Sequence, residues 1–218
     1  MDGKQDGKQD GKQDGKQGYH HGNLPQALVE AGLALARAGG PDAIGLREVS
    51  RQAGVSHNAA YRHYADHHDL VAAVAARCMD ELGALMRERT EAVTGPPGAR
   101  RAWARLDALG RAYVDFARTE PGWFRTAFSG AGEGTAPRQG EVPQLPADHP
   151  FRQLNAALDD LVDTGALPRA RRDGAEYAAW SSVHGFAGLL VDGPLQHMPA
   201  PEVRRALDAV LAVVTRGL

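Results

Sequence analysis

The chain has 218 residues, enough for one large domain or two modest domains with a buried core. Its 25 basic and 27 acidic residues leave a formal charge of −2, so any surface for nucleic acid must be local rather than global. One cysteine excludes an internal disulfide and fits a reducing, cytoplasmic setting, and no apolar run has the length of a signal peptide or membrane span. Abundant alanine and leucine without apolar–polar alternation predict an all-α protein.

The chain opens with four copies of DGKQ, from Asp2 to Gln17, which contain all of its lysines. Glycine at every fourth position and the absence of apolar side chains leave nothing to offset the entropy of ordering. Residues 1–18 are therefore expected to form a disordered tail.

Helical periodicity and capping signals predict nine helices and no strand. Asn23 and Pro25 mark the first start, Gly54 a stop, and Ser56 and Asp66 two further caps. Seven of the nineteen residues in 129–147 are glycine or proline, which predicts a long loop. The expected helices cover about 24–38, 46–53, 56–64, 66–94, 98–120, 123–128, 149–164, 169–191 and 201–216.

The second and third helices are joined by a tight turn at 53–56 and preceded by a longer helix, which is the pattern of a helix-turn-helix unit. Ala60 and Tyr64 share the face expected to pack on Val49 and the first helix. The exposed start of the third helix then carries side chains that suit a DNA groove. Asparagine can pair with adenine, arginine with guanine, and tyrosine with phosphate.

The run LREVSRQAGVSHNAAYRHYADHHDL resembles the DNA-binding signature of the TetR family of bacterial transcriptional regulators. Gly54, the Val55-Ser56 pair, Tyr61 and Leu70 carry this resemblance, which covers residues 23–70. The family usually has a phosphate-gripping lysine where this chain has a histidine at 67. The resemblance implies four base-facing residues, Arg47, His57, Asn58 and Arg62, and four that face the DNA backbone or support it, Ser56, Tyr61, His63 and His67.

The same resemblance implies a ligand-responsive regulator that is not an enzyme, usually a repressor on a palindromic double-stranded DNA operator. It divides the chain into a helix-turn-helix DNA-binding domain at 19–66 and a C-terminal domain for ligand binding and dimerisation at 67–218. Independently, the small residues within 176–193 and the apolar stripe of the last helix favour a homodimer through the last two helices. Packing within one chain is the alternative.

Trp180, His184 and Gly185 form a Trp-x3-His-Gly motif similar to one found in a subgroup of these regulators. Trp180 and His184 lie one helical turn apart and could present an aromatic wall and a polar group to a cavity. We expect an unknown small-molecule effector to contact them together with other aromatic residues, although core packing explains such residues equally well. The candidate set is Trp103, Tyr113, Phe116, Trp123, Phe124, Phe128, Trp180 and His184.

Metal-site and enzyme interpretations find less support in the sequence. His63 and His67 have metal-ligand spacing, but the helix break at Asp66 spoils it and no cysteine or carboxylate completes a set, so no metal or cofactor is expected. Glycine-rich phosphate loops, nucleophile elbows and HExxH motifs are missing. Residues 19–70 contain four arginines against five acidic residues, which leaves open a helical protein-interaction or small-molecule-binding module with weak or lost DNA binding.

Overall fold

The computed structural model describes residues 24–130 and 145–218, and the regular secondary structure in these ranges is entirely helical. The all-α prediction, with nine α-helices, is confirmed for these ranges. The expected tail at 1–18, the cap at Asn23 and the interior of the 129–147 loop lie outside the described residues. The helices are α1 (Leu24–Gly39), α2 (Leu46–Gln52), α3 (His57–Tyr61), α4 (His67–Glu91), α5 (Ala99–Thr119), α6 (Pro121–Ala127), α7 (Pro150–Asp163), α8 (Ala175–Val191) and α9 (Ala200–Gly217).

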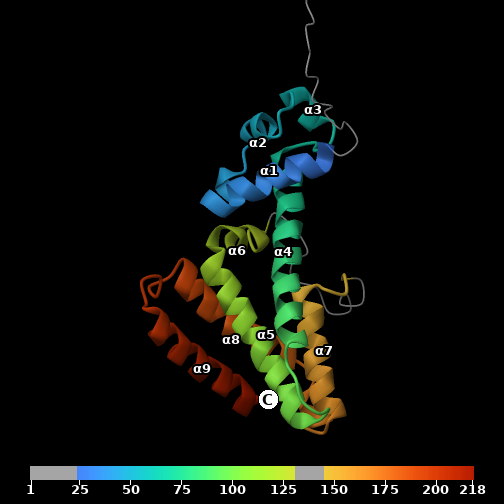
Figure 1. Ribbon diagram of the computed structural model, residues 1–218, viewed down its shortest axis with the longest axis vertical. Coiled ribbons are helices and arrows are strands. Elements are labelled where there is room, and N and C mark those ends of the chain that lie inside the picture. Colours follow the sequence, from blue (N-terminus) through green and yellow to red (C-terminus); the bar gives the residue numbers. More distant parts are fainter. Residues whose placement is uncertain (1–23, 131–144) are drawn as a thin grey trace, which may run out of the picture.

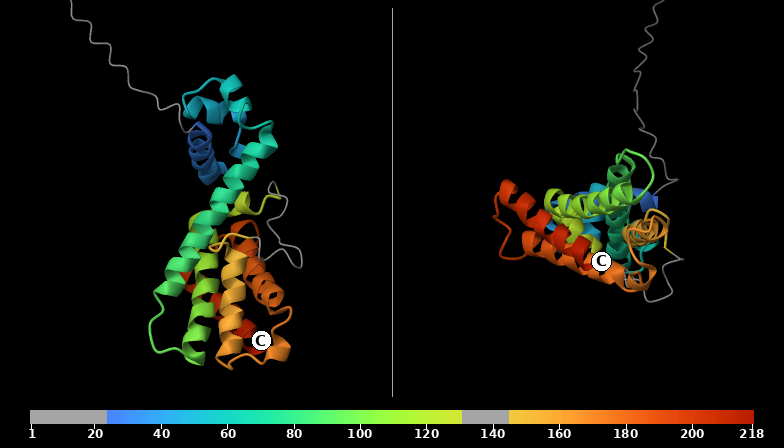
Figure 2. Two further views of the ribbon diagram at one scale, coloured as in Figure 1. Left: turned by 90° about the vertical axis from the view of Figure 1, so that its right-hand side faces the viewer. Right: turned by 90° about the horizontal axis from the view of Figure 1, so that it is seen from below.

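Helices α1, α2 and α3 form a small unit at one end of an elongated molecule (Figure 1). Helix α4 starts in this unit and runs the length of the molecule, past α6 and along α5 and α7. Helices α8 and α9 pack beside α5 on the side away from α4 (Figure 2). One helix therefore belongs to both parts of the chain.

The predicted caps at Ser56 and Asp66 form as expected. Ser56 Oγ accepts the backbone N–H of Ala59 at 3.2 Å. Asp66 Oδ1 accepts the N–H of Asp69 at 3.0 Å, while Asp69 Oδ2 accepts the N–H of Ala65 at 3.2 Å. Such reciprocal capping satisfies donors that a helix start otherwise leaves unpaired. It sets the position where α4 begins.

Several helix boundaries differ from the prediction, among them the end of α3 and the start of α8. Helix α3 ends at Tyr61 rather than near Tyr64, and the next three residues form a turn that brings the Tyr64 hydroxyl to 3.4 Å from the carbonyl oxygen of Pro25 in α1. The helix expected over 169–191 is divided into a 3-10 turn, Arg169–Arg171, and α8. Gly174, with φ of 78°, causes this break because a left-handed backbone cannot continue a right-handed helix.

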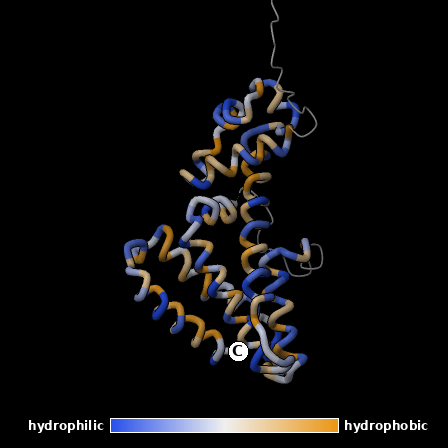
Figure 3. Tube along the Cα trace, in the orientation of Figure 1, coloured by the Kyte–Doolittle hydropathy of each residue, from blue (hydrophilic) through white to orange (hydrophobic). Residues whose placement is uncertain are grey.

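The buried apolar side chains form two clusters. The larger cluster extends from Leu28 and Val49, at the small end, through Cys78 to Ala187 and Leu207. The smaller cluster lies around Leu158, Leu161 and Leu167, which are exposed by at most 1%. Hydrophobic and hydrophilic residues alternate along α9, as its amphipathic sequence predicts (Figure 3). None of the described helices is long and apolar enough to cross a lipid bilayer.

Candidate functional site

Helix α3 is held by its inner face and presents the rest of its surface outward. Ala60 is fully buried against the cluster that contains Val49, and Gly54 adopts φ of 68° in the turn that brings α3 back across α2. The left-handed conformation is easy only for glycine. The expected packing of Ala60 and Tyr64 toward the first helix is what the structure has.

All eight predicted DNA-contact side chains are exposed. His57 and Tyr61 stack edge to face on α3 with ring centroids 4.7 Å apart, and Tyr61 is 49% exposed. The side chains of Asn58 and Arg62 make no hydrogen bond or ion pair to another described residue, so their polar groups are available to an external partner. Helices α2 and α3 lie at one end of the molecule (Figure 1). The arrangement suits insertion of α3 into a DNA groove.

His67 occupies a different environment from the other seven. Its Nε2 lies 2.6 Å from the carbonyl oxygen of Ile44, in the segment that leads into α2. A ring nitrogen at this distance from a carbonyl must carry the proton and donate it. His67 thus ties the first residue of α4 to the base of the helix-turn-helix unit, which agrees with a supporting role.

Asp66, His68 and Asp69 bring potential metal-ligand atoms within 4.8 Å of one another at the surface. Both carboxylates already accept backbone N–H groups in the cap of α4. These capping hydrogen bonds are sufficient to bring the two carboxylates together without a metal ion. His63 and His67 do not belong to this cluster.

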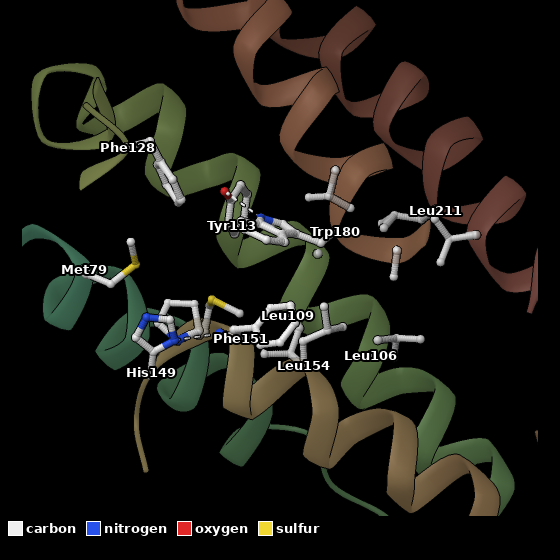
Figure 4. A pocket seen from close by; sticks show the side chains of 16 residues that line it. Met79, Leu106, Leu109, Tyr113, Phe128, His149, Phe151, Leu154, Trp180 and Leu211 are labelled. Atoms are coloured by element: carbon white, nitrogen blue, oxygen red, sulfur yellow. Dashed lines mark hydrogen bonds between the residues drawn. The ribbon is translucent and has the colours of Figure 1, made fainter. Parts of the chain in front are cut away.

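The C-terminal part contains a partly open cavity lined by residues of α4, α5, α7, α8 and α9 (Figure 4). Its empty space is about 630 Å³, including the part open to solvent. Three of the predicted effector residues line it, Tyr113, Phe128 and Trp180. His184 and Phe124 lie directly behind them, with the His184 ring 4.8 Å from Phe128 and 5.6 Å from Phe124.

A hydrogen-bonded chain forms the polar part of this wall. Trp180 Nε1 donates to the Tyr113 hydroxyl oxygen at 3.4 Å, and that oxygen lies 2.7 Å from His184 Nδ1. Burial raises the pKa of Tyr113, and burial lowers the pKa of His184. Both groups therefore favour their uncharged forms.

The structure places the other three predicted effector residues elsewhere. Trp103 packs with the smaller hydrophobic cluster. Trp123 Nε1 donates to the carbonyl oxygen of Leu33 at 2.9 Å, and the guanidinium of Arg37 lies 5.0 Å from the Trp123 ring centroid. Phe116 stacks near Trp123 at 6.5 Å between ring centroids. Trp123 thus belongs to the junction between α6 and α1, and Phe116 packs on it from α5.

Two protein families match this chain. The family described as "Bacterial regulatory proteins, tetR family" matches residues 28–74. The family described as "Tetracyclin repressor-like, C-terminal domain" matches residues 106–214, half of the chain. The chain belongs to the TetR family of transcriptional regulators. It is accordingly a DNA-binding regulator of transcription, and TetR-family regulators are not enzymes.

Solved structures share this TetR fold. A protein of unknown function from Rhodococcus sp. RHA1 is 26% identical, with a TM-score of 0.64 over 93% of this chain and 99% of its own. FadR from Bacillus subtilis, solved with stearoyl-CoA, is 10% identical, with a TM-score of 0.60 over 88% and 98%. PfmR from Thermus thermophilus is 17% identical, with a TM-score of 0.55 over the same shares. No functionally curated protein matches the chain.

Sequence reasoning missed most of the cavity lining of this TetR-family chain. The prediction named only aromatic residues and one histidine, whereas the lining also contains many aliphatic residues and methionines from α4, α5, α7, α8 and α9. Met79 and Met86 are seven residues apart on α4, a spacing that places them on one face and could have indicated a shared role. The missed residues are Met79, Met86, Leu106, Leu109, Gly110, His149, Pro150, Phe151, Leu154, Ala179, Val183, Leu211 and Val214.

The two partly buried histidines, His149 and His184, predict a loss of stability in mild acid. Burial lowers the pKa of His184 and of His149, and at His149 the Asp80 carboxylate opposes part of that effect. The unfolded chain therefore binds more protons than the folded chain below the ordinary histidine pKa of about 6.5, so stability decreases as the pH falls through that value.

We expect the free energy of unfolding, measured with urea at constant protein concentration, to be lower at pH 5.5 than at pH 7.5. His184→Gln should reduce this difference, whereas the same change at the exposed His197 should leave it intact. A His184→Gln variant with the full wild-type difference would contradict the prediction.

Proposed function

We propose that this TetR regulator is a homodimeric repressor that a small molecule releases from a palindromic operator. The observation that carries the proposal is the position of α4. Its first residue, His67, follows the turn after α3 and is hydrogen-bonded to the carbonyl oxygen of Ile44. Met79 and Met86 of the same helix line the cavity. A ligand that moves the middle of α4 would change the spacing of the two α3 helices in a dimer, which must match half-sites about 34–36 Å apart.

We propose the division predicted from the sequence, with a DNA-binding domain at 19–66 and an effector-binding and dimerisation domain at 67–218. Exposure supports DNA contacts by Arg47, Ser56, His57, Asn58, Tyr61, Arg62 and His63, with His67 in support. The cavity supports effector contacts by Tyr113, Phe128 and Trp180, backed by Phe124 and His184. The Trp-x3-His-Gly subgroup remains part of the proposal. FadR, crystallised with stearoyl-CoA, is a regulator of this fold with a bound ligand.

The dimer is proposed to form through α8 and α9. Leu189 and Val213 are 44% and 59% exposed and would be covered in such an interface, and Gly185 leaves open space where a second helix could approach. Two such helix pairs across a twofold axis would form a four-helix interface.

Aspartate at either Leu189 or Val213 is expected to dissociate this dimer. A buried, unpaired charge costs about 3–5 kcal/mol. The dissociation constant measured by analytical ultracentrifugation should therefore rise at least about 100-fold. Ala104→Asp, on the exposed surface of α5, is the matched control and should leave the dimer intact. If both variants keep the wild-type dissociation constant, the dimer does not form through this face of α8 and α9.

The test of the function is binding of the purified full-length protein to DNA from the region upstream of its own gene, followed by selection from a random DNA library. We expect saturable binding by a dimer, with an affinity that falls steeply with salt because phosphate contacts release counterions. The DNA site found in this way is then titrated with the protein in the presence and absence of a cavity ligand, to measure whether the ligand lowers the affinity for the operator. A typical coupling of about 1–3 kcal/mol corresponds to a 5- to 150-fold change.

The competing hypothesis is a helical interaction or small-molecule-binding module that has weak or lost DNA binding. Binding that stays weak and insensitive to sequence in both DNA experiments would favour it. A ligand that occupies the cavity but leaves operator affinity unchanged would refute release by that ligand.

A further inference from the structure

The cavity is lined, within the part of the chain that the structure describes, by side chains without a permanent charge. No aspartate, glutamate, lysine or arginine is among its sixteen lining residues. Four aromatic rings contribute to the wall, and Met79 and Met86 add flexible, polarisable surface that adapts to irregular ligands. The lining residues are drawn in Figure 4. The wall therefore favours an apolar molecule that contains rings.

The hydrogen-bonded chain in this wall satisfies the donors of Trp180 and Tyr113. The Tyr113 oxygen accepts from Trp180, so the Tyr113 hydroxyl proton is used when it is donated to His184 Nδ1 at 2.7 Å. Tyr113 is only 4% exposed, and an unused hydroxyl proton there would be costly. The side chains of Trp180, Tyr113 and His184 thus supply no cation. The Tyr113 oxygen retains one lone pair that can accept a hydrogen bond.

His149 provides the other polar group of the cavity. It caps α7 by accepting the N–H of Phe151 at its Nδ1, at 3.2 Å. An Nδ1 that accepts a hydrogen bond carries no proton, so the neutral ring carries its proton on Nε2. The Nε2–H of His149 is therefore a donor that the cap does not use. The His149 side chain is one of those that line the cavity (Figure 4).

We infer that the effector is an uncharged, predominantly aromatic molecule with a hydrogen-bond acceptor, such as a ketone, ester or lactone oxygen, rather than an organic anion or cation. This inference rests on the proposed function, because it names the ligand class of the same cavity. A carboxylate or ammonium group would lose its water without meeting an opposite charge, which costs several kcal/mol. A neutral carbonyl loses less and can accept from His149.

The test compares three ligands with one ring system and different head groups. Calorimetric titration of the full-length protein at pH 7.5 would use 2-acetylnaphthalene, 2-naphthoate and 2-naphthylmethylammonium. We expect the neutral ketone to bind at least about 10-fold more tightly than either ion, because only the ions bury an unpaired charge. Equal or tighter binding of an ion would overturn the inference. Failure of all three to bind would overturn it as well, since the cavity would then not accept apolar rings.

A matched pair of variants tests whether binding occurs in this cavity. Leu154→Trp places a large ring in the lining and should abolish binding of the ketone. Ala156→Trp, on the same helix and outside the lining, should bind as the wild type does. Circular dichroism and thermal melts check that both variants fold. If Leu154→Trp misfolds, Val183→Phe on α8 replaces it, and ketone binding that survives in the folded variant would overturn the assignment.

Operator binding in the presence of each ligand separates this inference from the proposed function. A ketone that binds selectively but leaves operator affinity unchanged would support the ligand class and count against effector release. A charged ligand that binds more tightly and releases the operator would support the function and overturn the ligand class.

Discussion

Alanine in place of Gly122 is expected to lower the free energy of unfolding by about 1–3 kcal/mol, the usual effect of overpacking a close contact. Gly122 is buried near the start of α6, and a Cβ atom there would lie 2.1 Å from the carbonyl oxygen of Ala36 and 2.6 Å from that of Arg37. Both neighbours are backbone atoms at the end of α1, so no side-chain rotation relieves the clash. The two helices would have to separate.

That separation would disturb every polar contact at the junction. The guanidinium of Arg37 donates through Nε to Glu120 at 2.7 Å and through its terminal nitrogen to the other carboxylate oxygen. Trp123 donates to Leu33 at 2.9 Å. Because α1 supports α2 and α3, Gly122→Ala should also weaken operator binding.

Urea unfolding and DNA titration of Gly122→Ala measure these two effects. Gly217→Ala is the matched control, since Gly217 is also helical but a Cβ there meets no atom within 4 Å. It should be neutral or slightly stabilising. A Gly122→Ala variant as stable as this control would show that the α1–α6 contact gives way without cost.

The second large effect is expected from the surface of α3. Asn58→Ala and Arg62→Ala should each weaken operator binding by about 1–3 kcal/mol, the discrimination carried by a good bidentate contact to a base. Fluorescence anisotropy with the selected operator measures the change. Binding to unrelated DNA should change little, because lost base contacts reduce specificity more than general affinity.

Arg100→Ala is the control for the loss of a positive charge. Arg100 is exposed in the first turn of α5, at the opposite end of the molecule from α3 (Figure 1). Its replacement should leave operator affinity and melting temperature unchanged. If Asn58→Ala and Arg62→Ala weaken operator and unrelated DNA equally, these residues contact phosphates instead of bases.

Helices α4 and α6 both connect the cavity to the DNA-binding unit, so a structural change at the cavity can reach that unit through either helix. Helix α4 connects the cavity to α3, as described above. Helix α6 places Phe124 5.8 Å from Tyr113 and places Trp123 against α1. A ligand that displaces the Tyr113 wall would therefore act on the DNA-binding unit through α6 as well as through α4. Gly122→Ala tests this second contact directly.

Most of the helical architecture and the exposed surface of α3 could be predicted from the sequence. Helix caps and stops depend on local chemistry, so Ser56, Gly54 and Asp66 could be identified from neighbouring residues alone. The exposed side of α3 followed from the burial of Ala60, which its four-residue spacing from Tyr64 indicates. The break at Gly174 was missed because a single glycine in a helical pattern does not reveal its φ angle.

The residues that form the cavity could not be predicted from the sequence, because they are brought together by the packing of distant helices. Aromatic residues at helical spacing have the same pattern whether they line a cavity, fill a core or join two domains. Trp123 joined α6 to α1, Phe116 stacked on Trp123 from α5, and Trp103 entered the second core cluster. His149 came to the cavity from the N-cap of α7. Which face of one helix meets which face of another depends on packing between residues distant in sequence, and a local pattern carries no information about that choice.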